Sequence, residues 1–294
     1  MVAAMDALRF PPGEVYVGRD MAGRRPTPGT ADVGRYTAGT GDRHPWYEGA
    51  SPFGGPVAPA LLYHSEVYRD LGWYLPNLIG NLHAKQEWDL FAPMPLGSPV
   101  RTRSTVVGRY RKRDRDYVVN EVLITDDEGR WLQRSRTHQS FLADAPADDL
   151  VLDKSRERRP ERRFDVEPGG EALPSFRRVV TLAMCEAFSG PVRSYHTDRE
   201  MARALGFPDV VVQGMLSICL VSELMTRAFG AGWLAGGQMQ ISLVNVLWGD
   251  EAVTTGGTAR EPQREGAAWR VPVDVWCAKD EGTKTIVGTA SARR

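Results

Sequence analysis

Two short loops in the sequence carry side chains that could transfer protons. The first places Asp42 directly after Gly41 and ends on Tyr47, and the second ends on His196, six positions after Gly190. Carboxylate and imidazole groups are the usual general acids and bases of enzymes, so these loops are candidates for acid–base chemistry. The same side chains also stabilise turns by hydrogen bonding to the backbone, which is the simpler interpretation of Asp42.

A third candidate is a glycine at the start of a long apolar segment. Gly214 follows Gln213 and opens a mostly apolar run that ends at Gly230. A helix over this run leaves its first backbone N–H groups without acceptors, and glycine lets a carbonyl group approach them closely. In the first half of the chain we place Pro59 at the corresponding position, and proline has no N–H to donate.

The elements that must position these residues are predicted to occur twice, because the sequence shows an internal duplication. Each half begins with a threonine able to cap a short helix, Thr30 in the first and Thr181 in the second. A glycine loop follows, and then a long apolar helix, expected over residues 56–73 and 214–230. Antiparallel strands complete each half and end in a hairpin, with turns at residues 126–129 and 280–282.

Each long helix needs a cover, and a curved antiparallel sheet supplies one. We therefore predict an α+β fold, with two antiparallel sheets each wrapped around a central helix and joined edge to edge into one continuous sheet. The first unit is assigned to residues 1–145 and the second to residues 175–294. Residues 146–174 are charged and rich in proline and glycine, which is typical of a linker.

Composition and charge argue against several classes of function. The chain has 37 basic and 37 acidic residues, and this balance disfavours a nucleic-acid partner. No apolar stretch reaches the roughly 18 residues that a membrane span needs, and the N-terminus lacks a signal-peptide pattern. Five scattered histidines and three unpaired cysteines show no metal-ligand spacing. We expect a cytoplasmic protein without a metal or other cofactor.

The order of elements and the two loops together resemble the hot-dog fold. More narrowly, they are similar to the MaoC-like group, which includes (R)-specific enoyl-CoA hydratases and 3-hydroxyacyl-thioester dehydratases. The resemblance covers residues 33–141 and 175–290, and the hydratase motif of the group reads G-D-x-N-P-x-H. The first loop, GDRHPWY at residues 41–47, keeps the Gly, Asp and Pro, whereas the second, GPVRSYH at residues 190–196, keeps the Gly and His.

The resemblance implies roles for the residues that match the motif. In the group, the Asp and His hold a water molecule and share the proton transfers, while N–H groups at the start of the central helix face the thioester oxygen. The matching residues are His196 as the acid or base, Gly214 as the amide donor and Asp42 as the retained acid. Pro191 replaces the acid in the second loop, but the second half keeps the His and the helix-start donor, which the first half has lost. We therefore expect one working pocket, in the second half.

Other residues are expected around this pocket. Substrate contacts are assigned to four side chains of the two loops and the helix start: Tyr47, Arg193, Tyr195 and Gln213. The carboxylate that would assist His196 stays open between Glu186, Asp198 and Asp42. A site shared between Asp42 and His196 is a minority hypothesis.

Three functions stay open at this point. The first is a hydratase or dehydratase acting on an enoyl or 3-hydroxyacyl thioester, delivered by coenzyme A or by a carrier protein. The second is a repurposed hot-dog enzyme of polyketide-type metabolism that catalyses Michael addition, cyclisation or isomerisation. The third is a non-catalytic partner subunit that binds an acyl thioester. In each case the expected partners are the acyl thioester and a second copy of the chain, with no nucleic acid and no membrane.

Overall fold

The computed structural model describes residues 15–69, 82–112, 115–142, 164 and 169–294. The first half contains the elements β1 Asp20–Arg24, α2 Thr30–Thr40, η2 Pro45–Tyr47, η3 Glu66–Arg69, β2 Leu82–Leu90, β3 Arg101–Lys112, β4 Arg115–Thr125 and β5 Trp131–Leu142. The second half contains β6 Glu171–Ala172, β7 Phe176–Val179, α3 Leu182–Ser189, α4 Arg199–Ala204, α5 Gly214–Phe229, α6 Ala231–Leu234, β8 Gln238–Leu243, β9 Ala252–Ala259, β10 Gln263–Glu265, β11 Ala268–Lys279 and β12 Lys284–Arg293. None of the helices in these ranges is long and apolar enough to cross a membrane.

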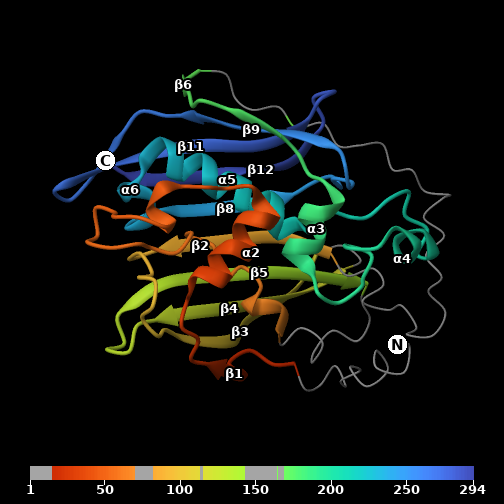
Figure 1. Cartoon of the computed structure of the whole chain (residues 1–294), viewed down its shortest axis with the longest axis horizontal. Helices are drawn as coiled ribbons and strands as arrows, with labels where there is room; N and C mark the ends of the chain where they lie inside the picture. The colour runs from red at the N-terminus through yellow and green to blue at the C-terminus, as the bar shows by residue number, and fades with distance from the viewer. Residues whose placement is uncertain (1–14, 70–81, 113–114, 143–163, 165–168) are drawn as a thin grey trace.

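The strands of the described residues form one twelve-stranded sheet. Its order is β1-β3-β4-β5-β2-β8-β12-β11-β9-β6, with β10 paired to β11 and β7 paired to β9. The two halves meet where β2 pairs antiparallel with β8, in register from Lys85–Ser242 to Asp89–Gln238. The predicted edge-to-edge joining of the two copies is confirmed, and the helices lie together on one face of the sheet (Figure 1).

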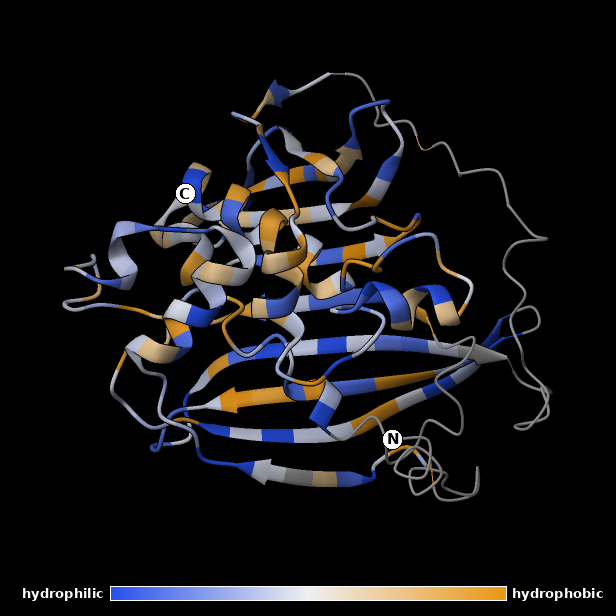
Figure 2. Ribbon diagram, turned by 45° about the vertical axis from the view of Figure 1, so that its right-hand side comes forward, coloured by the Kyte–Doolittle hydropathy of each residue, from blue (hydrophilic) through white to orange (hydrophobic). Residues whose placement is uncertain are grey.

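Helix α5 fills the concave face of the sheet. Every residue from Met215 to Thr226 is buried, and the helix ends at Gly230, whose φ of 50° suits glycine. Hydrophobic residues gather in this helix and alternate with polar ones along the strands (Figure 2). The prediction of a long buried helix over residues 214–230 is therefore confirmed.

The prediction of a matching long helix over residues 56–73 is wrong for its described part, residues 56–69. That segment runs as successive i→i+3 turns, such as Leu62 N–H to Pro59 O at 3.0 Å, and only η3 is helical. Two buried polar side chains tie it to distant segments: His64 stacks on Phe188, and the Glu66 carboxylate pairs with an arginine of β1. Tertiary contacts of this kind can override a local helix preference. Residues 70–73 lie outside the described residues.

Two smaller expectations have different outcomes. Thr181 caps α3 as predicted, because its hydroxyl accepts from Met184 N–H at 3.2 Å. Thr30 does not cap α2; Gly29 is the N-cap residue, and its N–H donates to the Asp32 carboxylate at 3.0 Å. The predicted turns at residues 126–129 and 280–282 join β4 to β5 and β11 to β12.

Most of the predicted linker, residues 146–174, lies outside the described residues. The part that is described includes β6, which pairs with β9 through Glu171–Ala259 and Ala172–Thr258. The chain is thus already part of the second half of the sheet before residue 175. The domain boundaries at residues 145 and 175 stay predictions.

Candidate functional site

Backbone hydrogen bonds fix how the two glycine loops correspond. In the first half Val57 N–H donates to Trp46 O at 2.9 Å, and in the second Val211 N–H donates to Tyr195 O at 3.0 Å. Both segments also form an isolated antiparallel bridge, Val57 with Pro95 and Val211 with Trp248. Counting from these bonds, Tyr47 corresponds to His196, as predicted, and the equivalent of Gly214 is Ala60. Pro59 therefore matches Gln213, one residue away from the predicted pairing with Gly214.

One ring nitrogen of His196 makes a hydrogen bond to the backbone, and the other makes none among the described residues. Nδ1 lies 2.7 Å from Val211 O, and because a carbonyl only accepts, Nδ1 carries the proton. The ring also packs against Tyr195, with centroids 4.1 Å apart. Burial lowers the pKa of His196, so the ring is neutral near pH 7. In the described part of the chain Nε2 has no partner, which leaves its lone pair available as a base.

Gly214 opens α5 three residues after Val211. Within the described residues, the Gly214 and Met215 amides have no backbone acceptor, as expected for the first turn of a helix. Their N–H groups and the helix dipole favour negative charge at this end. A Cβ built on Gly214 would lie 2.2 Å from Leu243 Cδ2 and 3.4 Å from His83 Nδ1, so only glycine fits without displacing a neighbour.

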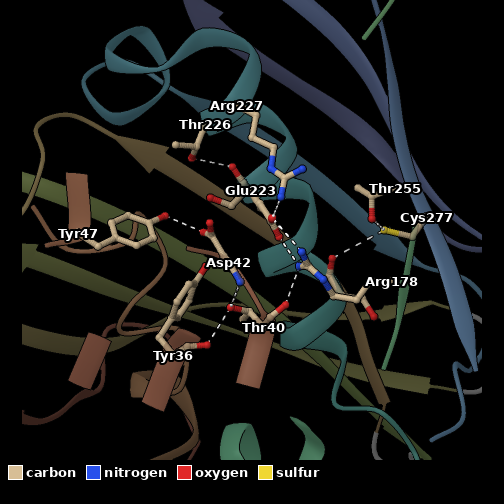
Figure 3. Close-up of polar contacts among 12 residues, drawn as sticks. Tyr36, Thr40, Asp42, Tyr47, Arg178, Glu223, Thr226, Arg227, Thr255 and Cys277 are labelled. Atoms are coloured by element: carbon tan, nitrogen blue, oxygen red, sulfur yellow. Dashed lines mark hydrogen bonds and ion pairs between the residues drawn. The ribbon is translucent and has the colours of Figure 1, made fainter. Parts of the chain in front are cut away.

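Asp42 and Tyr47 form a buried pair near Glu223, in the C-terminal half of α5. The Tyr47 hydroxyl donates to Asp42 Oδ2 at 2.6 Å, and the side chains are 3% and 4% exposed for Tyr47 and Asp42 respectively (Figure 3). Burial and the nearby Glu223 carboxylate raise the pKa of Asp42 to about 6. Burial also raises the pKa of Tyr47 well above its usual range, so Tyr47 stays a donor. The predicted substrate contact of Tyr47 stays a prediction; in this structure its hydroxyl bonds to Asp42.

Two arginines bind the Glu223 carboxylate beside this pair, a cluster that the sequence did not indicate. Both terminal nitrogens of Arg178 donate to the Glu223 carboxylate, and the bond from Nη2 to Oε1 is 3.0 Å long. Nη1 also donates to Thr40 O at 2.6 Å (Figure 3). Arg227, one turn along α5, makes the second ion pair with Glu223. Arg178 comes from β7 and Thr40 from α2, so the cluster ties the first-half loop to the second-half helix.

Asp42 and His196 do not meet. Asp42 interacts with Glu223 of α5, whereas His196 bonds to Val211, which precedes the helix. Glu223 lies nine positions after Gly214, or about 13 Å along a helix axis. The site shared between Asp42 and His196 is not formed in this structure.

The remaining sequence candidates have mostly structural partners. The Asp198 carboxylate caps α4 by accepting from Met201 N–H at 3.0 Å, and it also pairs with Arg193. The bond from Met201 N–H, and after it the bond from Arg193, lower the pKa of Asp198 below its usual range. Gln213 is the N-cap residue of α5 and accepts from Ser189 Oγ at 3.5 Å. Glu186 is exposed on α3.

No protein-family model and no curated protein matches the sequence. A MaoC-like dehydratase superposes with a TM-score of 0.73 at 17% identity, covering 95% of this chain and 98% of the other. A MaoC-like dehydratase from Phytophthora capsici gives 0.71 at 15% identity, covering 97% and 98%. A conserved hypothetical protein of Mycobacterium tuberculosis described as a double hot-dog gives 0.63 at 14% identity, covering 98% of each chain.

The chain has a double hot-dog fold. The predicted resemblance to the MaoC-like proteins is confirmed at the level of the fold, as is the predicted α+β class. In this double hot-dog only the second half has a long central helix among the described residues.

The double hot-dog also brings to Gly214 a histidine that no sequence motif indicated. His83 lies on β2 of the first half, next to the start of α5 in the second half. Its Nδ1 lies 3.1 Å from the Tyr68 hydroxyl and its Nε2 lies 3.0 Å from Gln86 Oε1. No sequence motif could link His83 to Gly214, because the two residues are 131 positions apart. Among the described residues no group of three or more His, Cys, Asp or Glu could hold a metal ion.

Proposed function

We propose that the protein is a hydratase- or dehydratase-type enzyme acting on an enoyl or 3-hydroxyacyl thioester. One observation carries the proposal: His196 is fixed through Nδ1–H at Val211 O, three residues before the unpaired amides at Gly214. In this proposal His196 is the base and the amides are the oxyanion donors, both at one end of the same helix. The likeness of fold to MaoC-like dehydratases supports the same class of reaction.

The chemistry assigned to these groups follows from their charge and position. In hydration, Nε2 of His196 takes a proton from water while the oxygen attacks Cβ of the enoyl thioester. Electrons move toward the thioester oxygen, where the Gly214 amide and the helix dipole stabilise the developing charge. His196 then releases the proton that it took from water, Cα gains one proton in exchange, and the 3-hydroxyacyl thioester leaves with one water added overall. Dehydration is the reverse sequence.

The test is hydration of crotonyl-CoA by the full chain, followed as loss of absorbance of the conjugated thioester. We expect steady turnover by the wild type and a loss of at least ~100-fold in kcat for His196→Ala, because removal of a general base typically has this effect. Tyr47→Phe is the control, since Tyr47 bonds to Asp42 near Glu223, in the C-terminal half of α5. A wild type that turns over no enoyl thioester, or equal rates for His196→Ala, would contradict the proposal.

A second function, an intramolecular addition or isomerisation, is favoured by Pro191. Pro191 stands where the hydratase motif has its acid, and no carboxylate perturbs His196 among the described residues. With one base instead of two groups to orient water, a nucleophile within the substrate is a plausible replacement for water. Product analysis with an acyl thioester that carries its own hydroxyl separates the two. A ring-closed product without a water adduct favours this function, whereas efficient hydration of crotonyl-CoA excludes it.

A further inference from the structure

His83 is supplied to the start of α5 by the other half of the chain. It lies on β2, the strand that pairs with β8 at the junction of the two halves. Its Nδ1 is 3.4 Å from the point where Gly214 would carry a Cβ, so the imidazole lies directly against the helix start. Leu243 Cδ2 lies 2.2 Å from the same point, so His83 and Leu243 both pack against the glycine at the first amides of α5.

The hydrogen bonds around His83 determine which of its nitrogens carries the proton. The Gln86 amide nitrogen donates to Glu87 O at 3.2 Å, and Gln86 Oε1 accepts from the Thr137 hydroxyl at 2.8 Å. Gln86 Oε1 is therefore an acceptor for His83 Nε2–H as well. Nδ1 is left unprotonated and accepts from the Tyr68 hydroxyl, so its one lone pair is available to a substrate only when that hydroxyl turns away. Burial lowers the pKa of His83 to about 4, so the neutral base is the main form near pH 7.

The position of Nδ1 matches a specific atom of a thioester substrate. When the Gly214 amide holds the thioester oxygen, Cα is only one bond from the carbonyl carbon. A base that exchanges the Cα proton must therefore lie beside this amide, within hydrogen-bond reach of Cα. His83 Nδ1 meets that condition, whereas His196 is tethered to Val211, before the helix.

We infer that His83 is the catalytic group that exchanges the Cα proton, and that His196 serves the oxygen at Cβ. The inference rests on the proposed function and divides its two proton transfers between the halves of the chain. In this arrangement neither half is sufficient: the second supplies the amide donors and His196, and the first supplies His83.

Proton balance requires that the two imidazoles share one extra proton. In dehydration, Nδ1 of His83 takes the proton from Cα, and the electrons of that C–H bond form the Cα–Cβ double bond as the Cβ–O bond breaks. The departing oxygen takes a proton from Nε2 of a protonated His196, so water leaves. The proton gained by His83 then returns to His196 through solvent. In hydration, His196 takes the proton from water and protonated His83 gives one to Cα.

The experiment separates the two proton transfers. Butyryl-CoA has Cα hydrogens and no leaving group, so its uptake of deuterium from D2O, read by mass spectrometry, reports only the Cα step. Crotonyl-CoA hydration reports the whole reaction. The variants are His83→Gln and His83→Ala, with His138→Gln as the matched control. His138 is a histidine of the neighbouring strand β5 whose ring bonds to Glu87 and Tyr110 instead.

The expected results differ between the variants. His83→Gln loses at least ~100-fold in both assays, as for a general acid or base. His196→Ala loses hydration and keeps deuterium uptake, and His138→Gln keeps both. Added imidazole restores deuterium uptake to His83→Ala, which a purely structural role would not allow.

Three outcomes would overturn the inference. Wild-type rates for His83→Gln would do so while leaving the proposed function intact. Hydration by the wild type without any deuterium uptake would exclude a separate base at Cα. A loss in His83→Ala that imidazole does not restore, in a variant with the thermal midpoint of the wild type, would reduce His83 to a structural residue. Absence of hydration in the wild type itself contradicts the proposed function instead.

Discussion

Replacing Asp42 with asparagine is expected to stabilise the protein at alkaline pH. The pKa of Asp42 is raised from 3.8 to about 6 in the folded protein, mainly by burial. A raised carboxyl pKa gives stability that is complete below pH 3.8 and is lost as pH rises through 6, because the unfolded chain ionises more easily. Two pKa units correspond to about 3 kcal/mol at pH 8. Asparagine cannot ionise and can still accept from the Tyr47 hydroxyl.

Urea unfolding of wild type and Asp42→Asn at pH 4 and pH 8 measures this difference. The gain from asparagine should reach up to about 3 kcal/mol at pH 8 and fall below about 1 kcal/mol at pH 4, since the folded carboxyl is then protonated and the unfolded one is about half protonated. Asp280→Asn is the surface control: Asp280 pairs with Arg177 in solvent, and its pKa is lowered, so no gain at pH 8 is expected.

An Asp42→Asn variant less stable than wild type at pH 8 would refute the reasoning. It would mean that the arginines near Glu223 stabilise an ionised Asp42 more strongly than burial disfavours it. Turnover of crotonyl-CoA should be unchanged in this variant. A large loss of turnover would instead bring back the site shared between Asp42 and His196.

Two further predictions concern α5. Gly214→Ala places a Cβ 2.2 Å from Leu243 Cδ2, beside the first amides of α5. We expect kcat/KM for crotonyl-CoA to fall at least ~10-fold, because the added methyl group displaces the substrate from these amides. The thermal midpoint, read by calorimetry, should move little because the Leu243 side chain can shift. Glu223→Gln leaves Arg178 without its buried carboxylate partner, and we expect a loss of roughly 3 kcal/mol in urea unfolding. An unchanged kcat/KM in the first variant, or unchanged stability in the second, would contradict the roles assigned here.

Local patterns in the sequence were sufficient for the elements of the fold. The unbroken apolar run at residues 214–230 predicted α5, and Gly129 and Gly282 marked hairpin turns that the structure contains. The repeat of the same order of elements predicted two units joined in one sheet. These predictions succeeded because helix and strand periodicity, and the need for glycine at positive φ, act over a few residues.

The same local reasoning failed for residues 56–69. Their apolar spacing resembles that of α5, but His64 stacks on Phe188 and Glu66 binds Arg24, two partners distant in the sequence. Contacts of this kind override helix propensity, which is worth only tenths of a kcal/mol per residue.

Local sequence patterns were enough to predict the duplication, the strands, the buried helix and two candidate loops. Which side chains lie near one another depended on the fold: it placed Asp42 beside Glu223 and Arg178, and it placed His83 rather than Asp42 near Gly214. The physical reason is the pairing of β2 with β8, which brings together residues more than a hundred positions apart. No local pattern encodes that proximity, because it depends on the register between two strands of different halves.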